Sequence, residues 1–348
     1  QIWSMKILRK LGLLSLVISM LAVTSCSNDF EVNGPLTEKL AVYGLVNFND
    51  SAHYIKIYKT FVTEDNVLVA AQNMDNYMMY DSLEVAMVCY DETNGTSSYH
   101  HFDTTSIVPK DSGIFTNPSN PSRQVLYVNH DVLNPYDSCA LQIKNKYTGK
   151  LMAQSGCRLV YPRTYGTASW TSDSANPYRA DRTIAVAGNN DSLITNGKLE
   201  LRIPSTNAYC YQAYYNFYYW ERASDSDPEV LMGPIKVNIG TATPTDITAA
   251  VPFLWNPSSF FTVLLNQLSH LDANSQVKRR TGPVHLCVWA AGNKYASYIA
   301  NNNQASLSII EERPTISNIT NGIGLFSSRY LAIYRNCILN PASVRVLT

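Results

Sequence analysis

The stretch Cys139-Ala-Leu-Gln-Ile-Lys-Asn-Lys-Tyr-Thr-Gly-Lys-Leu-Met-Ala-Gln-Ser-Gly-Cys157 shows the pattern from which the fold can be inferred. Two strand-like segments flank a three-residue loop that ends in Gly149, and such a loop is typical of a β-hairpin with a bulge. Pairing Lys146 with Lys150 places Cys139 directly opposite Cys157, where two side chains are close enough for a disulfide. The stretch therefore predicts two antiparallel strands and a candidate Cys139–Cys157 disulfide.

Similar strand-sized segments recur in both halves of the chain. In the first half, Ile55, Ile57 and Phe61 share one parity, which indicates a strand with one buried face. In the second half, apolar and charged residues alternate along 198–203, and the segment 210–220 resembles the paired B and C strands of a fibronectin type III-like sandwich, joined by a short turn. Further strands are expected at 41–46, 83–89, 124–128 and 284–291.

One segment has helical periodicity instead. Between 258 and 271, Phe261, Leu264, Leu265 and Leu268 recur at the spacing of one helix face, and Ser258 or Ser259 can cap its start. We therefore expect a helix that packs on a sheet.

These patterns predict an all-β protein with one or two helices. We expect two immunoglobulin/fibronectin III-like β-sandwich domains after a lipoprotein signal peptide, since the length of 348 residues suits two ordinary domains. The expected divisions are 1–25 for upstream residues and signal peptide, 26–38 for a tether, 39–162 for the N-terminal β-sandwich domain, and 163–348 for a C-terminal β-sandwich-like domain with the helix near 258–271.

The N-terminal segment indicates where in the cell the protein is located. Lys6, Arg9 and Lys10 precede the uncharged segment 11–22, which ends shortly before Cys26. This order is typical of a secretory signal peptide, and the apolar stretch is shorter than the roughly 20 residues that a spanning helix needs. Its end resembles the lipobox of bacterial lipoproteins, so Cys26 is predicted to carry a lipid and anchor the chain to the outer membrane. A plain secretory peptide with a chance cysteine is the alternative.

The residues after Cys26 bear on the side of the membrane. Asp29 and Glu31 resemble the acidic signal that follows the lipidated cysteine in surface-exposed lipoproteins of the Bacteroidetes. We expect display on the cell surface, with the periplasmic leaflet as the alternative.

Composition narrows the classes of partner. Lys plus Arg and Asp plus Glu are equal, at 27 each, so no broad electrostatic field would recruit nucleic acid. Charged residues make up 16% of the chain, while tyrosine reaches 23 copies. Tyrosine favours strands, and it also supplies contact area at binding surfaces.

No pattern of a known catalytic or metal site is found. The sequence has no C-x-x-C, no zinc-finger spacing and no G-x-S-x-G. His100 and His101 are adjacent, and adjacent side chains on a strand point to opposite faces, so they are not expected to share a metal. We expect no cofactor and no enzyme activity, although a pair of glycosidase carboxylates needs no sequence proximity.

Five Asp-Ser or Asp-Thr pairs resemble the O-glycosylation sequon of the Bacteroidetes. Asp-Ser is also ordinary turn chemistry, so each site alone has a second interpretation. The candidate acceptors are Ser51, Ser82, Thr104, Ser174 and Ser192.

Three stretches of the sequence are read together: Ala41-Val-Tyr-Gly-Leu-Val46, His53-Tyr-Ile-Lys-Ile-Tyr-Lys59 and Pro314-Thr-Ile-Ser-Asn-Ile-Thr-Asn-Gly-Ile-Gly-Leu-Phe-Ser-Ser-Arg-Tyr330. They resemble an uncharacterised family of Bacteroidetes outer-membrane lipoproteins. The resemblance implies two β-sandwich domains and an accessory role in nutrient uptake. In 321–324, both glycines are expected to permit positive φ or close backbone approach.

The function predicted from these features is a non-catalytic, ligand- or partner-binding module of an outer-membrane uptake system. Its expected partners are an outer-membrane transporter or another surface lipoprotein. An adhesive or structural, fimbria-like surface subunit is the alternative, and a glycan hydrolase is a remote one.

Overall fold

The computed structural model describes residues 38–63, 66–79, 81–110, 124–162, 170–171, 183–188, 190–201, 205–246, 249–268, 276–304 and 316–347. Strands dominate these residues, with a few short helices, so the prediction of an all-β fold with few helices is confirmed. Within the described ranges, the helices are all too short or too polar to cross a membrane. The predicted signal peptide, Cys26 and most of the predicted tether lie outside them.

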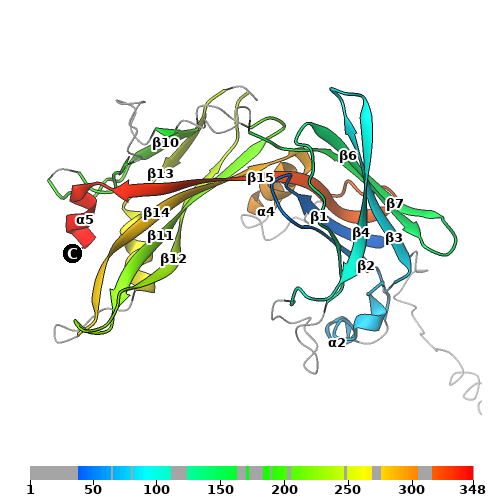
Figure 1. The fold of residues 1–348 in the computed structure, drawn as a ribbon, viewed down its shortest axis with the longest axis horizontal. Helices are drawn as coiled ribbons and strands as arrows, with labels where there is room; N and C mark the ends of the chain where they lie inside the picture. Colours follow the sequence, from blue (N-terminus) through cyan, green and yellow to red (C-terminus); the bar gives the residue numbers. More distant parts are fainter. Residues whose placement is uncertain are drawn as a thin grey trace, which may run out of the picture.

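The first half of the chain forms seven strands and a small helical segment (Figure 1). The elements are β1 (Leu40–Val46), β2 (His53–Lys59), α2 (Val67–Ala70), the 3-10 helix η1 (Met74–Asn76), β3 (Leu83–Asp91), β4 (Thr96–Thr105), β5 (Leu126–Asn129), β6 (Asp137–Asn145) and β7 (Leu151–Arg158).

The second half contains the longest strands. Its elements are β8 (Trp170–Thr171), β9 (Thr183–Ile184), β10 (Gly197–Leu201), β11 (Cys210–Arg222), β12 (Val230–Ala242), β13 (Val251–Trp255), α3 (Ser259–Gln267), β14 (Lys278–Ala291), α4 (Asn293–Gln304), β15 (Gly322–Leu339) and α5 (Pro341–Leu347).

One continuous sheet runs through both halves in the order β12-β11-β14-β15-β1-β2-β5-β4-β3-β6-β7, and β13-β10-β8 form a separate small sheet. The strand β15 joins the halves and crosses from one to the other in Figure 1. Its residues 322–328 pair with β1 in parallel, and most of 329–337 pair with β14 in antiparallel orientation. The far strand β7 curls back to the segment before β15, where Gln154 and Thr320 exchange two backbone hydrogen bonds.

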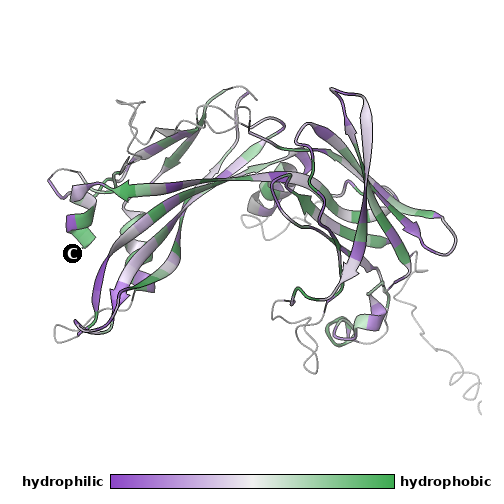
Figure 2. Cartoon of the chain, viewed as in Figure 1, coloured by the Kyte–Doolittle hydropathy of each residue, from purple (hydrophilic) through white to green (hydrophobic). Residues whose placement is uncertain are grey.

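Two hydrophobic cores form because the strands alternate in polarity, which Figure 2 shows as alternating green and purple along each strand. The first core contains Ile55 together with Phe326 from β15. The second contains Tyr215 from β11, Phe253 from the small sheet and Phe260 from α3. Val160, which precedes the predicted division near residue 162, belongs to the second core, while Ile319 and Phe326, which follow it, belong to the first. The immunoglobulin-like character of either half stays a prediction.

Two local predictions need correction. Residues 210–220 form one strand, β11, and not two strands with a turn, because irregularities near Ala213 and Phe217 accommodate its length within the ladder. The helix near 258–271 exists as α3, but Ser258 makes no side-chain cap, and its own N–H donates to Asn256 Oδ1.

The two glycines of 321–324 allow β15 to reach β1. Gly324 has φ +116°, and a Cβ at this position would lie 2.0 Å from the carbonyl oxygen of Val42. A Cβ on Gly322 would lie 2.7 Å from the carbonyl oxygen of Leu40. The predicted need for positive φ or close approach is confirmed.

The predicted hairpin is present. Cys139 pairs with Cys157 in the β6–β7 ladder, although a bulge between Ile143 and Lys144 shifts the register near the turn. Gly149 adopts φ +67° in the loop. The hairpin and the register at the cysteines are therefore confirmed.

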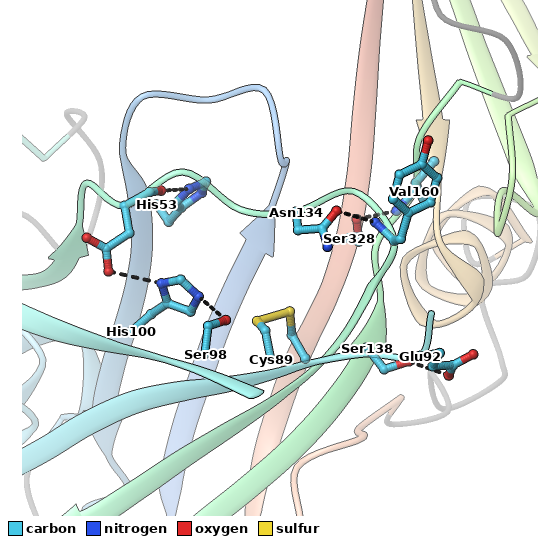
Figure 3. The surroundings of a disulfide bond; sticks show 12 residues. His53, Cys89, Glu92, Ser98, His100, Asn134, Ser138, Val160 and Ser328 are labelled. Carbon is cyan, nitrogen blue, oxygen red and sulfur yellow. Dashed lines mark hydrogen bonds and ion pairs between the residues drawn. A yellow bond between two sulfur atoms is a disulfide. The ribbon is translucent and has the colours of Figure 1, made fainter. Parts of the chain in front are cut away.

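The predicted Cys139–Cys157 disulfide is wrong, because Cys139 is bonded to Cys89 and Cys157 is a free thiol (Figure 3). Cys139 lies directly across from both cysteines. The N–H of Leu159 donates to the carbonyl of Asp137, so Cys139–Cys157, two residues along, is also a hydrogen-bonded pair. Cys139 and Cys89 form a non-hydrogen-bonded pair, in which the two side chains lie closer together than in a hydrogen-bonded pair.

We expect Gly324→Ala to prevent stable folding or to lower the free energy of unfolding by more than about 3 kcal/mol, because it combines a forbidden φ with a backbone clash. Gly149→Ala is the matched control. Its φ is also positive, but nothing lies within 4 Å of the added Cβ, so its cost is about 1 kcal/mol. Urea unfolding monitored by circular dichroism measures both, and equal losses would contradict the argument.

Alkylation of the unfolded, non-reduced protein followed by peptide mapping is expected to recover Cys89 linked to Cys139 and Cys157 alkylated. Reduction should lower the free energy of unfolding by about 2–4 kcal/mol, because the bond joins residues 50 apart in sequence. A linked Cys139–Cys157 peptide would restore the original prediction.

Candidate functional site

The sheet of the second half presents one face to the second core and the opposite face outward. Tyr211, Tyr215 and Phe217 of β11 point into the core. The alternate residues Tyr214 and Tyr218 lie on the outward face and are only partly buried. We call this outward surface the aromatic face; its members are Tyr214, Tyr218 and Trp220 of β11, Lys236 of β12, Arg280, His285 and Trp289 of β14, and Arg329 of β15.

One end of the aromatic face is covered. The side chains of Cys210 and Ala291 are buried there, together with Ile299 of α4. Further along β11, Asn216 is partly exposed, and Lys236 on the neighbouring strand is exposed. The open part of the face therefore starts beyond α4.

Cationic side chains lie over the rings of this face. Lys236 Nζ is 4.1 Å from the ring centroid of Tyr214. The guanidinium carbons of Arg280 and Arg329 lie 5.0 Å and 4.4 Å from the rings of Trp220 and Trp289. Such contacts hold the rings in place and bring positive charge to the surface.

Two titratable groups of the face are shifted toward their neutral forms. Burial lowers the pKa of His285, and the charge of Arg335 lowers it further, so this imidazole is favoured in its neutral form. Burial raises the pKa of the Cys287 thiol, while a hydrogen bond with Tyr214 and the charges of Lys236 and Arg335 oppose that rise. The positive charge of the face therefore comes from its Lys and Arg side chains.

A second polar group lies in the first half, near the disulfide (Figure 3). His100 Nδ1 is 2.9 Å from Asp131 Oδ2, and its Nε2 is 2.9 Å from Ser98 Oγ. Ser98 and His100 share one face of β4, because they are two residues apart on a strand. His100 is buried, whereas Ser98 is exposed.

Asp131 is held in place by its neighbours. Asn129 donates from Nδ2 to Asp131 Oδ2 at 2.9 Å, and its Oδ1 accepts the N–H of Asp131. The hydrogen bond from Asn129 is the main cause of the lowered pKa of Asp131, followed by the hydrogen bond from His100. His53 Nε2 lies 3.1 Å from the carbonyl oxygen of Asp131, and burial lowers the pKa of His53.

This arrangement fixes the tautomer of His100. An ionised Asp131 only accepts hydrogen bonds, so Nδ1 carries a proton, and Nε2 of the neutral imidazole is then the acceptor for the hydroxyl of Ser98. A hydroxyl, a base and an orienting carboxylate in this order are the parts of a nucleophilic triad. Across the described residues, no three His, Cys, Asp or Glu side chains are grouped as a metal site would require.

The predicted modification sites are not brought together. Cys26 and Ser174 lie outside the described residues. Ser51 and Thr104 are exposed, and Ser82 is partly exposed just before β3. Their modification stays a prediction.

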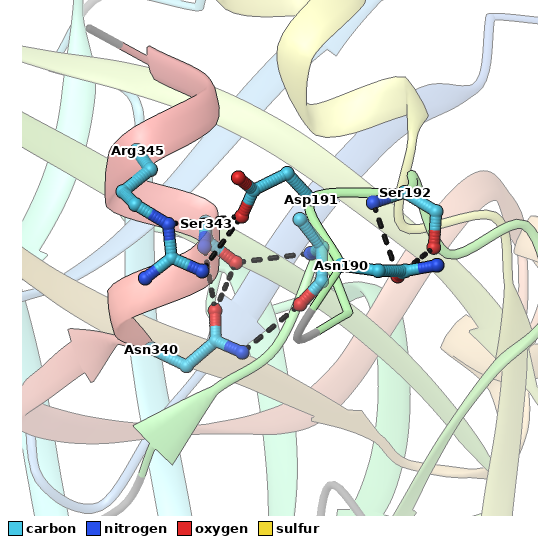
Figure 4. Close-up of polar contacts among 7 residues, drawn as sticks. Asn190, Asp191, Ser192, Asn340, Ser343 and Arg345 are labelled. Carbon is cyan, nitrogen blue, oxygen red and sulfur yellow. Dashed lines mark hydrogen bonds and ion pairs between the residues drawn. The ribbon is translucent and has the colours of Figure 1, made fainter.

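Ser192 lies in a turn that packs on α5 (Figure 4). Its Oγ donates to Asn190 Oδ1 at 2.6 Å, and Asp191 accepts from Arg345 Nη2 at 2.7 Å. Ser343 Oγ accepts the N–H groups of Val186 and Ala187 in the same region. The candidate acceptor Ser192 thus sits in an exposed turn with a defined conformation.

Sequence reasoning missed both groups of residues. The two-residue spacing of Ser98 and His100 was a readable signal, but Asp131 reaches them only through the β5 ladder. The tyrosines of β11 were noticed as strand residues, whereas their arrangement with Lys236, Trp289 and Arg329 depends on four strands lying side by side.

No protein-family model and no curated protein matches the chain. Among solved structures, the C-terminal globular domain of an oligosaccharyltransferase from Pyrococcus abyssi is 10% identical, with 73% of this chain and 50% of that chain covered and a TM-score of 0.23. The BSP domain of a biofilm associated protein is 6% identical, with 85% and 58% covered and a TM-score of 0.15. The chain thus spans between half and three fifths of each structure, and similarity at this level supports no statement about function.

Proposed function

We propose that this chain is a non-catalytic, ligand-binding module of an outer-membrane uptake system, anchored by a lipid on Cys26 and displayed on the cell surface. Its partner there would be an outer-membrane transporter or another surface lipoprotein. The lipobox-like sequence supports the location. The aromatic face is the observation that carries the binding role, because partly exposed Tyr and Trp rings are typical of recognition surfaces.

The ligand class that fits this face is an anionic glycan. The apolar faces of sugar rings can stack on Tyr214 and Trp220, while Lys236 supplies positive charge for carboxylate or sulfate groups. Glu229 lies beside this surface and pairs with Arg280, and Asp225 pairs with Arg222 and Lys278 at the same end of the sheet. Lys236, which lies over the ring of Tyr214, supplies the positive charge.

Titration calorimetry with acidic and neutral oligosaccharides tests this role. Trp220→Ala and Tyr214→Ala should each weaken binding of an acidic glycan at least about fivefold, because a lost ring contact is worth about 1 kcal/mol or more. Lys236→Gln should weaken binding and reduce its dependence on salt.

Tyr147→Ala is the matched control, because Tyr147 is 78% exposed at the tip of the β6–β7 hairpin, far along the chain from the aromatic face. It should bind as the wild type does. The role is contradicted if the wild type binds no acidic glycan, or if Tyr147→Ala weakens binding as much as Tyr214→Ala.

A polymerising adhesive subunit has less support. Such a subunit would accept a strand at a free sheet edge. β12 ends the sheet, but it contains Pro234, which has no N–H to donate. β7, at the other end, is bridged to Thr320.

A hydrolase is the second candidate, because Ser98, His100 and Asp131 have the order and distances of a nucleophilic triad. In this function Ser98 Oγ would attack an ester carbonyl carbon while His100 Nε2 takes the hydroxyl proton. The two candidates predict opposite results with a fluorophosphonate probe: the binding module stays unlabelled, whereas the hydrolase is labelled on Ser98.

Labelling that Ser98→Ala abolishes and Ser97→Ala retains would establish the hydrolase and overturn the non-catalytic proposal. Ser97 is a suitable control because it is the neighbouring residue on β4 and points to the other face. Absence of labelling in the folded wild type would remove the hydrolase candidate.

A further inference from the structure

Four apolar side chains near the start of the described chain are exposed together. Val62, Val67, Leu68 and Val69 are 45%, 58%, 46% and 62% exposed, and α2 buries none of its residues. Scattered apolar side chains are normal on a protein surface, but four within eight residues form a patch that indicates contact with another apolar phase. We call Phe61, Val62 and α2 the apolar tip.

Aromatic and basic residues surround the apolar tip. The rings of Tyr58 and Tyr77 meet edge to face at 5.0 Å. Lys56 Nζ lies 4.9 Å from the ring of Tyr58, and Lys110 Nζ lies 5.8 Å from the ring of Tyr77. Apolar side chains bordered by Tyr and Lys have the order found at the boundary between lipid tails and headgroups.

The tip also has an open hollow beside it, with a volume of about 700 Å³. Phe61 and Val69 form its apolar lining, and the side chains of Asn66, Asn73 and Asn76 form its polar lining. A hollow of this mixed character can receive a polar headgroup while Val67 and Leu68 enter the apolar layer.

The tip lies where the predicted tether joins the folded chain. Lys39 N–H donates to Thr60 Oγ1 at 2.9 Å, and its carbonyl accepts the N–H of Thr60. Phe61 follows directly. Lys39 is 13 residues after Cys26 in the sequence, so a fully extended tether reaches at most about 45 Å. In Figure 1, α2 lies at the bottom of the first half.

We propose that the apolar tip docks on the surface of the lipid bilayer next to the anchor. The inference rests on the proposed lipid at Cys26 for its orientation. Glu64 and Asp65 stand between Val62 and Val67 in the sequence, so the segment 61–70 carries no positive charge of its own. Insertion of Val67, Leu68 and Val69 therefore drives binding, and anionic lipid is not required.

Flotation with phosphatidylcholine vesicles tests the docking in the mature chain without its lipid, residues 27–348, which retains every described element. This chain should float with the vesicles. The double variant Val67→Ser/Leu68→Ser should need at least tenfold more lipid for half-maximal binding. Circular dichroism verifies that the variants are folded.

Leu254→Ser/Leu265→Ser is the matched control, because these leucines of β13 and α3 are 79% and 78% exposed but lie in the second half. It should float as the unsubstituted chain does. Docking is overturned if the unsubstituted chain stays unbound, or if both double variants bind equally.

Different measurements test the proposed function. An intact mass of the full-length protein without lipid would contradict the proposed anchor, and a titration that detects no binding of acidic glycans would contradict the proposed ligand. Neither result alters the flotation measurement, which reports only on the apolar tip.

Discussion

The pairing of β15 with both β1 and β14 is the constraint on which the rest of the structure depends. A single strand of 18 residues supplies a parallel partner to the first half and an antiparallel partner to the second. Because the peptide backbone is continuous, the two sheets keep a common strand direction at the point where they meet. The cores on either side can therefore be separate without the halves being independent.

The middle of β15 is where the halves are joined most tightly. Ser328 is completely buried, its Oγ accepts the N–H of Val160, and its carbonyl accepts the N–H of Gly292. Ser327 Oγ accepts the N–H of Tyr295 in α4. A serine satisfies backbone groups that a purely apolar strand would leave without partners, and a buried N–H without a partner is costly. The crossover is thus polar although both neighbouring cores are apolar.

The proposed functional surfaces follow from this arrangement. The tether, the apolar tip and the serine-histidine-aspartate group belong to the first half, while the aromatic face belongs to the second. A module held at a membrane by its first half and offering rings and cations on its second half would suit capture of a ligand outside the cell.

The sequence by itself determined the features that depend on neighbours along the chain. Alternating polarity predicted the strands, the loop ending in Gly149 predicted the hairpin register, and the glycines at 322 and 324 predicted close backbone approach. These succeed because strand faces and turn conformations are local properties. Only the tertiary structure decided which partner each strand takes. Cys139 faces a cysteine on both sides, and the hydrogen-bond phase of the ladder selects Cys89. Likewise, Asp131 meets His100, and Trp289 joins Tyr214 on one face, only after distant strands pair, which no local pattern encodes.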